Sequence, residues 1–127
     1  MNPWHTNRHE KIVAYLCRHF DLPEHVEAEV NASHEHGCEE YGEWNHHQPE
    51  FNHAQEIAEE LTDALGLAAF AIEASESGCG ASSDESDAFW AMVAYISGAR
   101  MAAGRMQVAR EARILRDSKA SDAREAS

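Results

Sequence analysis

Four carboxylates stand in two pairs that have the same internal spacing. They are the side chains of Glu40, Glu43, Glu60 and Asp63. Residues three apart lie on one face of an α-helix, so each pair presents both of its carboxylates to one side. A short connection makes two successive helices antiparallel neighbours, and the two carboxylate faces can then meet. The pattern predicts a site for divalent cations.

Carboxylates gathered in this way need a counterion. Like charges held close together raise one another's pKa and cost folding free energy. Mg²⁺ and Mn²⁺ prefer oxygen ligands, and two such ions would neutralise four negative charges. The ions could also bind a triphosphate, polarise a phosphorus atom and lower the pKa of an attacking water. We therefore expect Mg²⁺ or Mn²⁺ as the cofactor.

Acidic pairs at this spacing are also common on solvated helix faces, and Glu56 and Glu59 form another one. Either of the two carboxylate pairs taken alone would be interpreted as part of a solvated helix surface. The occurrence of both pairs on consecutive predicted helices of a short chain is the more specific signal.

The residues around the two pairs form two recognisable segments. Residues 40–43 read Glu-Tyr-Gly-Glu, and residues 59–65 read Glu-Glu-Leu-Thr-Asp-Ala-Leu. The chain resembles the MazG-like all-helical nucleoside triphosphate pyrophosphohydrolases, which carry Glu-x-x-Glu, a spacer of variable length and Glu-x-x-Asp. The first segment is similar to the family's Glu-x-Gly-Glu, and the second to its Glu-Glu-Leu-x-Asp. The spacer here is sixteen residues long, and the resemblance covers about residues 8 to 105.

The resemblance implies a four-helix bundle that forms dimers or tetramers and cleaves a (d)NTP to its monophosphate and pyrophosphate. It implies that the four carboxylates bind the metal and that Glu40 or Glu43 accepts a proton from the attacking water. Basic groups of the last helix usually assist, and Arg100 and Arg105 are the candidates by position. Trp44 directly follows the first pair, so its ring could stack on the base.

Small residues in the last two predicted helices leave room for a purine, for example in dGTP. The abundance of alanine after Asp63 departs from the family's pattern and leaves the shape of the pocket open.

Hydrophobic periodicity predicts an all-α chain with helices over residues 7–20, 24–44, 51–75 and 88–116. The segments 45–49 and 75–87 read as loops, and Ser86 or Asp87 as the cap of the last helix. We expect a single domain over residues 1–117, followed by a polar tail over 118–127. The helix over 51–75 is apolar on several faces after Asp63, which favours a homodimer or homotetramer.

The chain has 127 residues and a net charge of −13, which argues against nucleic acid or an anionic membrane as a partner. Seven bases lie at or after Arg100, and only three precede it. No apolar run approaches the ~20 residues of a membrane span, and no signal peptide is recognisable, so a cytoplasmic protein is expected. The three cysteines suggest no disulfide framework.

Other residues of the chain bear on alternative functions. All nine histidines lie within the first 53 residues, and His34 and Cys38 have the spacing of a zinc pair. The chain has no His-Asp dipeptide, which argues against HD-type phosphohydrolase chemistry. The alternative to an enzyme is an acidic helical interaction module without activity. Metal-dependent release of pyrophosphate distinguishes the two.

Overall fold

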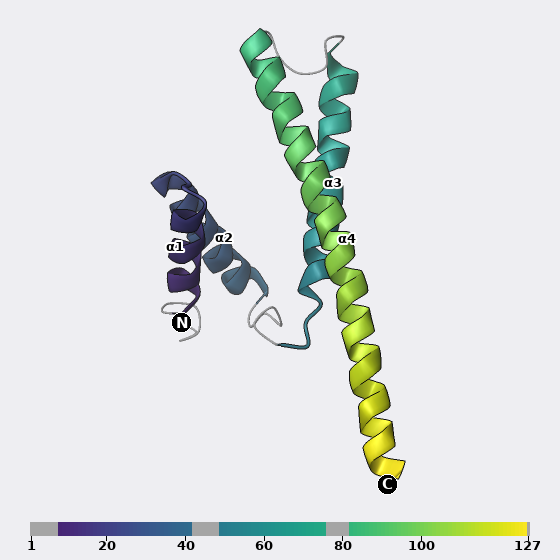
Figure 1. The fold of residues 1–127 in the computed structure, drawn as a ribbon. Coiled ribbons are helices and arrows are strands. Elements are labelled where there is room, and N and C mark those ends of the chain that lie inside the picture. Colours follow the sequence, from purple (N-terminus) through teal and green to yellow (C-terminus); the bar gives the residue numbers. More distant parts are fainter. Residues whose placement is uncertain (1–7, 42–48, 76–81, 127) are drawn as a thin grey trace. The chain divides into compact units, whose positions relative to one another are not determined.

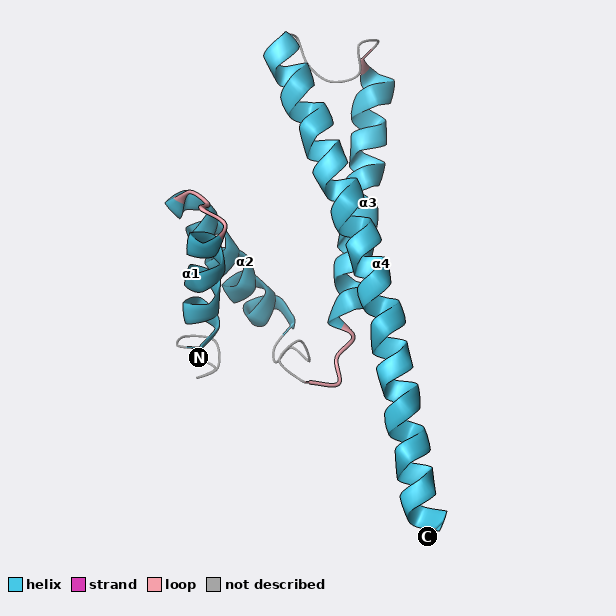
Figure 2. Cartoon of the chain, viewed as in Figure 1, coloured by secondary structure: helices cyan, strands magenta, loops and turns pink. Residues whose placement is uncertain are grey.

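The computed structural model describes residues 8–41, 49–75 and 82–126, with the backbone alone for residues 37–41. These residues form four α-helices and no strand (Figures 1 and 2), which confirms the all-α class. The helices are α1 (Glu10–His19), α2 (Glu24–Tyr41), α3 (His53–Ala74) and α4 (Ser83–Ala126). The chain divides into two compact units, Met1–Phe51 and Asn52–Ser127. The single domain over residues 1–117 stays a prediction.

The first unit is a hairpin of α1 and α2. Val13 and Cys17 lie four residues apart on one face of α1 and are its buried side chains. The helix then ends in a tight hydrogen-bonded turn. The N–H of Leu22 donates to the carbonyl of Cys17 at 2.8 Å, and the N–H of Asp21 donates to that of Arg18 at 3.2 Å. This is the Schellman arrangement, and it places Asp21 in the left-handed region with φ 53°.

The helices of the second unit begin at side-chain caps. The Asn52 side chain accepts a hydrogen bond from the N–H of Gln55 at 3.1 Å and caps α3. At α4 the Ser82 hydroxyl accepts from the N–H of Glu85 at 3.2 Å. The same hydroxyl donates to the Glu85 carboxylate at 3.5 Å.

Both ends of α4 differ from the sequence prediction. The expected cap at Ser86 or Asp87 is wrong, because the Ser82 hydroxyl caps the helix, which starts at Ser83. The polar stretch that reads as a loop carries acids, which are favoured at the positive end of a helix. Residues 118–126 continue the helix instead of forming a separate tail. They contain no glycine or proline to end it and are rich in alanine, a strong helix former.

The second unit is a hairpin of α3 and α4 (Figure 1), and small buried side chains lie along its seam. The buried side chains of this unit are Ala54, Ala58, Ala68 and Ala103. Among the described residues no large side chain is fully buried. The 44 residues of α4 span ~66 Å and the 22 of α3 span ~33 Å, so α4 continues well beyond its partner. The hairpin therefore leaves much apolar surface without a cover of its own.

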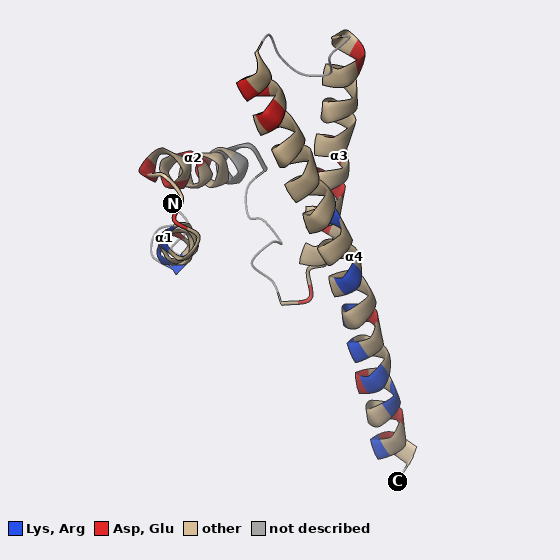
Figure 3. Cartoon of the chain, turned by 45° about the horizontal axis from the view of Figure 1, so that its top comes forward, with Lys and Arg blue, Asp and Glu red and all other residues tan. Residues whose placement is uncertain are grey.

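The basic side chains of α4 lie in its C-terminal part. The first turn of the helix carries Asp84 and Glu85, and the basic side chains follow from Arg100 onward, interspersed with acidic ones such as Glu111 and Asp117 (Figure 3). None of the described helices combines the length and the apolar character that a bilayer crossing requires.

Candidate metal and phosphate site

The predicted carboxylates fall in both units. Glu60 and Asp63 are exposed side chains of α3. Glu40 belongs to the last turn of α2, and only its backbone is described. Glu43 and Trp44 lie outside the described residues. The meeting of the two carboxylate pairs, one from each unit, stays a prediction.

A groove between α3 and α4 holds one of these carboxylates. It has a volume of about 330 Å³. Its walls are Gln55, Ala58, Glu59, Thr62 and Asp63 of α3 with Arg100 and Gln107 of α4. The α3 residues recur at intervals of three and four, and the two α4 residues are seven apart, so each set lies on one face of its helix. Asp63 and Arg100 both line the groove, and each was predicted from the sequence as a site residue for a different reason.

A hydrogen bond between the helices fixes the Arg100 side chain. The Arg100 Nε–H donates to the Thr62 hydroxyl oxygen at 3.0 Å. The Thr62 hydroxyl in turn donates to the Ala58 carbonyl at 2.8 Å, so its one proton is already used. A Cβ built on Gly104 would lie 3.6 Å from Arg100 Nη1, which shows that the guanidinium lies beside this glycine.

The opposite charges of the groove do not pair with each other. Among the described residues, Arg100 makes the hydrogen bond to Thr62 and no ion pair, and Asp63 makes neither a hydrogen bond nor an ion pair. Glu59 accepts a hydrogen bond from the Gln55 amide at 3.2 Å. The groove therefore offers an unpaired carboxylate and an unpaired pair of guanidinium nitrogens, which suit a ligand that carries both a cation and an anion.

Two further candidates on α3 and α4 do not belong to this groove. Glu60 and Arg105 are exposed and do not line it. Three residues of the groove, Thr62, Gln55 and Gln107, were not predicted from the sequence. Thr62 stands at the variable position of Glu-x-x-Asp, and the spacing of Gln55 and Thr62 by seven residues was the available signal.

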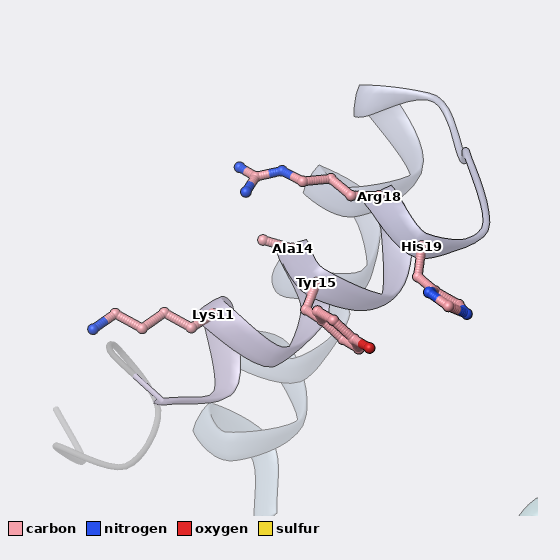
Figure 4. Close-up of a pocket in the computed structure, with 5 residues that line it drawn as sticks. All are labelled: Lys11, Ala14, Tyr15, Arg18 and His19. Atoms are coloured by element: carbon pink, nitrogen blue, oxygen red, sulfur yellow. The ribbon is translucent and has the colours of Figure 1, made fainter.

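Two hollows lie in the described part of the first unit. One of about 560 Å³ lies along α1 and is lined by Lys11, Ala14, Tyr15, Arg18 and His19 (Figure 4). The rings of Tyr15 and His19 stack there with centroids 5.8 Å apart. The other, of about 370 Å³, contains His9 and His34, whose rings stack at 3.8 Å. Neither hollow is lined by a predicted metal ligand of the carboxylate pairs.

Of the possible zinc pair of His34 and Cys38, only His34 has a described side chain. The His34 ring stacks on His9, and the side chain of Cys38 is not among those described. Within residues 8–36, 49–75 and 82–126 no group of three or more histidine, cysteine or acidic side chains is arranged to hold a metal ion. Two of the four predicted carboxylate ligands, Glu40 and Glu43, lie outside this set.

Comparison of the chain with protein-family models, with curated proteins and with solved structures found no match.

Proposed function

We propose that the chain is a metal-dependent nucleoside triphosphate pyrophosphohydrolase, which converts a (d)NTP to (d)NMP and pyrophosphate. The observation that supports this best is the groove in which Asp63 and Arg100 lie without pairing. A triphosphate bound to a divalent cation carries charge of each sign, and each would neutralise one of these two side chains. Its metal suits the carboxylate, and its phosphate oxygens suit the guanidinium.

The proposed metal ligands are Glu40, Glu43, Glu60 and Asp63. All are carboxylates, which fits Mg²⁺ or Mn²⁺ and not a softer metal. The bound ions would supply electrostatic stabilisation and a water of lowered pKa. Glu40 or Glu43 would accept the proton from that water as it attacks the α-phosphorus. This arrangement requires the end of α2 to reach the Glu60 and Asp63 face of α3.

Other residues would bind the phosphates and the base of the substrate. Arg100 would bind phosphate oxygens from within the groove, and Arg105 lies further along α4. Trp44 would stack on the base, for which a purine such as that of dGTP is our first choice. Gln55 and Gln107 place two amides in the same groove, and amides can read the hydrogen-bonding edge of a base.

The proposed active form is a homodimer or homotetramer. Leu67, Phe70 and Tyr95 are 71%, 68% and 79% exposed, and each is a large apolar side chain in the middle of a helix. Burying such a side chain is worth about 1.5–3 kcal/mol, so a second copy that covers several of them would be stabilised substantially.

The enzyme proposal is tested by incubating the protein with each of the common dNTPs and NTPs. Pyrophosphate and monophosphate should form with Mg²⁺ or Mn²⁺ and should stop forming when EDTA is added. Asp63→Asn should abolish product formation in the same assay. Release of orthophosphate, or a rate that EDTA does not change, would contradict the proposal.

The second candidate is a non-enzymatic helical interaction module. It is favoured by the alanine seam of the α3–α4 hairpin and by the large apolar side chains left exposed beside it. An interaction module would release no pyrophosphate from any triphosphate, so the assay above separates the two candidates.

A further inference from the structure

The Thr62 hydroxyl can only accept a hydrogen bond from Arg100. The Thr62 hydroxyl has a single proton, and this proton goes to the Ala58 carbonyl. Its oxygen can therefore only accept, and it accepts from Arg100 Nε at 3.0 Å. The guanidinium is a rigid plane, so a bond at Nε fixes the direction in which its two Nη groups point.

The hydrogen bond between Thr62 and Arg100 matters because the groove also contains two carboxylates. Asp63 and Glu59 line the same groove as Arg100, and a free arginine side chain would be drawn to either carboxylate. The Thr62 bond instead holds the guanidinium apart, and both Nη groups stay available. Gly104 lies beside Nη1, where a Cβ would be in van der Waals contact at 3.6 Å, so the absence of a side chain at this position keeps that side of Nη1 uncrowded.

We propose that Thr62 is a positioning residue that orients the Arg100 guanidinium to bind phosphate oxygens through its two Nη groups. This proposal rests on the proposed function, because it assigns the polyphosphate of the substrate as the ligand. Two parallel N–H···O bonds are the geometry in which arginine binds phosphate most strongly. Thr62 would thereby set the affinity for the polyphosphate without touching it.

A matched pair of substitutions separates the hydroxyl of Thr62 from its shape. Thr62→Val keeps the branched side chain and removes the acceptor, and Thr62→Ser keeps the acceptor and removes the methyl group. The probe is inorganic tripolyphosphate with Mg²⁺, and its affinity is measured by calorimetry on the full chain. We expect Thr62→Val to weaken binding about fivefold, on the order of one surface hydrogen bond, and Thr62→Ser to bind like wild type.

Kinetics give a second readout that a purely structural role would not produce. For a (d)NTP, Thr62→Val should raise KM by about the same factor and leave kcat within about twofold, because the lost interaction serves binding. Arg100→Lys keeps the charge but lacks the Nε–H and the fork, so it should weaken binding even when Thr62 is intact. Arg113→Gln removes a positive charge from exposed α4 surface outside the groove and is the control for net charge.

The outcomes distinguish this proposal from the proposed function. Equal affinities of Thr62→Val and wild type for tripolyphosphate would overturn it, as would a Thr62→Ser variant as weak as Thr62→Val or a wild-type protein that does not bind the probe. If the affinities change as expected but wild type releases no pyrophosphate, the phosphate-binding role of Arg100 stands and the hydrolase assignment fails.

Discussion

At the scale of single residues, Asp63 and Arg100 carry opposite charges in one groove without forming an ion pair. Exposed ion pairs contribute only about 0–1 kcal/mol, since water solvates both partners and pairing costs side-chain entropy. The fold therefore loses little stability by keeping the two apart. A ligand that neutralises both charges gains more, because it brings its own cation and anion together.

Asp63→Asn tests the contribution of the carboxylate. The substitution keeps the volume of the side chain, and Asp63 makes no hydrogen bond or ion pair among the described residues, so the fold should survive. It removes one negative charge from a cation site. We expect a loss of at least ~100-fold in metal-dependent turnover, with a melting temperature no lower than that of wild type in the absence of metal.

Glu56→Gln is the matched control, because Glu56 lies on the same helix and neither the sequence motif nor the groove includes it. Its activity should stay near that of wild type, with a small loss of stability from the charge removed near the start of α3. Full activity of Asp63→Asn would show that the carboxylate pair is surface decoration.

The sequence predicted the residues of the groove only in part. Helical spacing places Glu60 and Asp63 on one side of α3, yet Asp63 alone lines the groove, because α4 decides which part of that side is enclosed. Thr62 was missed because its role depends on Arg100, which lies 38 residues away. Spacing within one helix carries no information about such a partner.

At the scale of elements, the turn after α1 contains a residue that is poorly suited to its conformation. Asp21 occupies the left-handed position of the Schellman turn, where glycine has no Cβ penalty. Its side chain also adds negative charge at the negative end of the helix. The turn is held by its two backbone hydrogen bonds, so the first unit tolerates the strain.

Asp21→Gly should therefore stabilise the α1–α2 hairpin by about 0.5–1 kcal/mol, the scale of a relieved left-handed residue. Urea unfolding followed by circular dichroism measures the change, and Asp21→Ala is the control because it removes the charge and keeps the Cβ. A glycine variant less stable than the alanine variant would contradict this account of the turn.

The helices were predictable to the extent that their signals are local. Periodic apolar residues and proline placed α1, α2 and α3 to within a few residues of their observed bounds. The start of α4 was missed by five residues, since a run of serine and acidic residues fits both a loop and a capped first turn. The capped turn is marked by the hydrogen bonds between Ser82 and Glu85, which become evident only when the two residues are considered together.

At the scale of the whole molecule, the α3–α4 hairpin leaves large apolar side chains exposed. Leu67 and Phe70 lie three apart on α3 and are more than two-thirds exposed. We expect light scattering at micromolar concentration to give at least twice the chain mass of 14.1 kDa. The double variant Leu67→Glu with Phe70→Glu should lower that mass to the monomer and keep its helical content, because a charge in an apolar interface is costly.

Glu73→Gln, a polar change on the same helix, should leave the mass unchanged and serves as the control. A monomeric wild-type protein would refute the oligomer. If the wild-type protein were a monomer and the double variant were less stable than it, the first unit would be the part of the chain that covers Leu67 and Phe70.

How the two units meet is beyond what patterns within a helix can predict. The spacing of Glu60 and Asp63 fixes a face of α3, and the spacing of Glu40 and Glu43 would do the same for α2. Neither spacing states which face packs against which. The sequence supports the meeting of the four carboxylates through its resemblance to the MazG-like family, and the supporting structural observation is the Asp63 and Arg100 groove.

The central claim is that a metal-activated water attacks the α-phosphorus of a nucleoside triphosphate. Hydrolysis in water enriched in ¹⁸O, followed by mass spectrometry of both products, tests it most directly. Our account predicts one ¹⁸O atom in the monophosphate, unlabelled pyrophosphate, and no reaction without Mg²⁺ or Mn²⁺. Label in pyrophosphate, release of orthophosphate, or intact triphosphate after incubation with metal would contradict it.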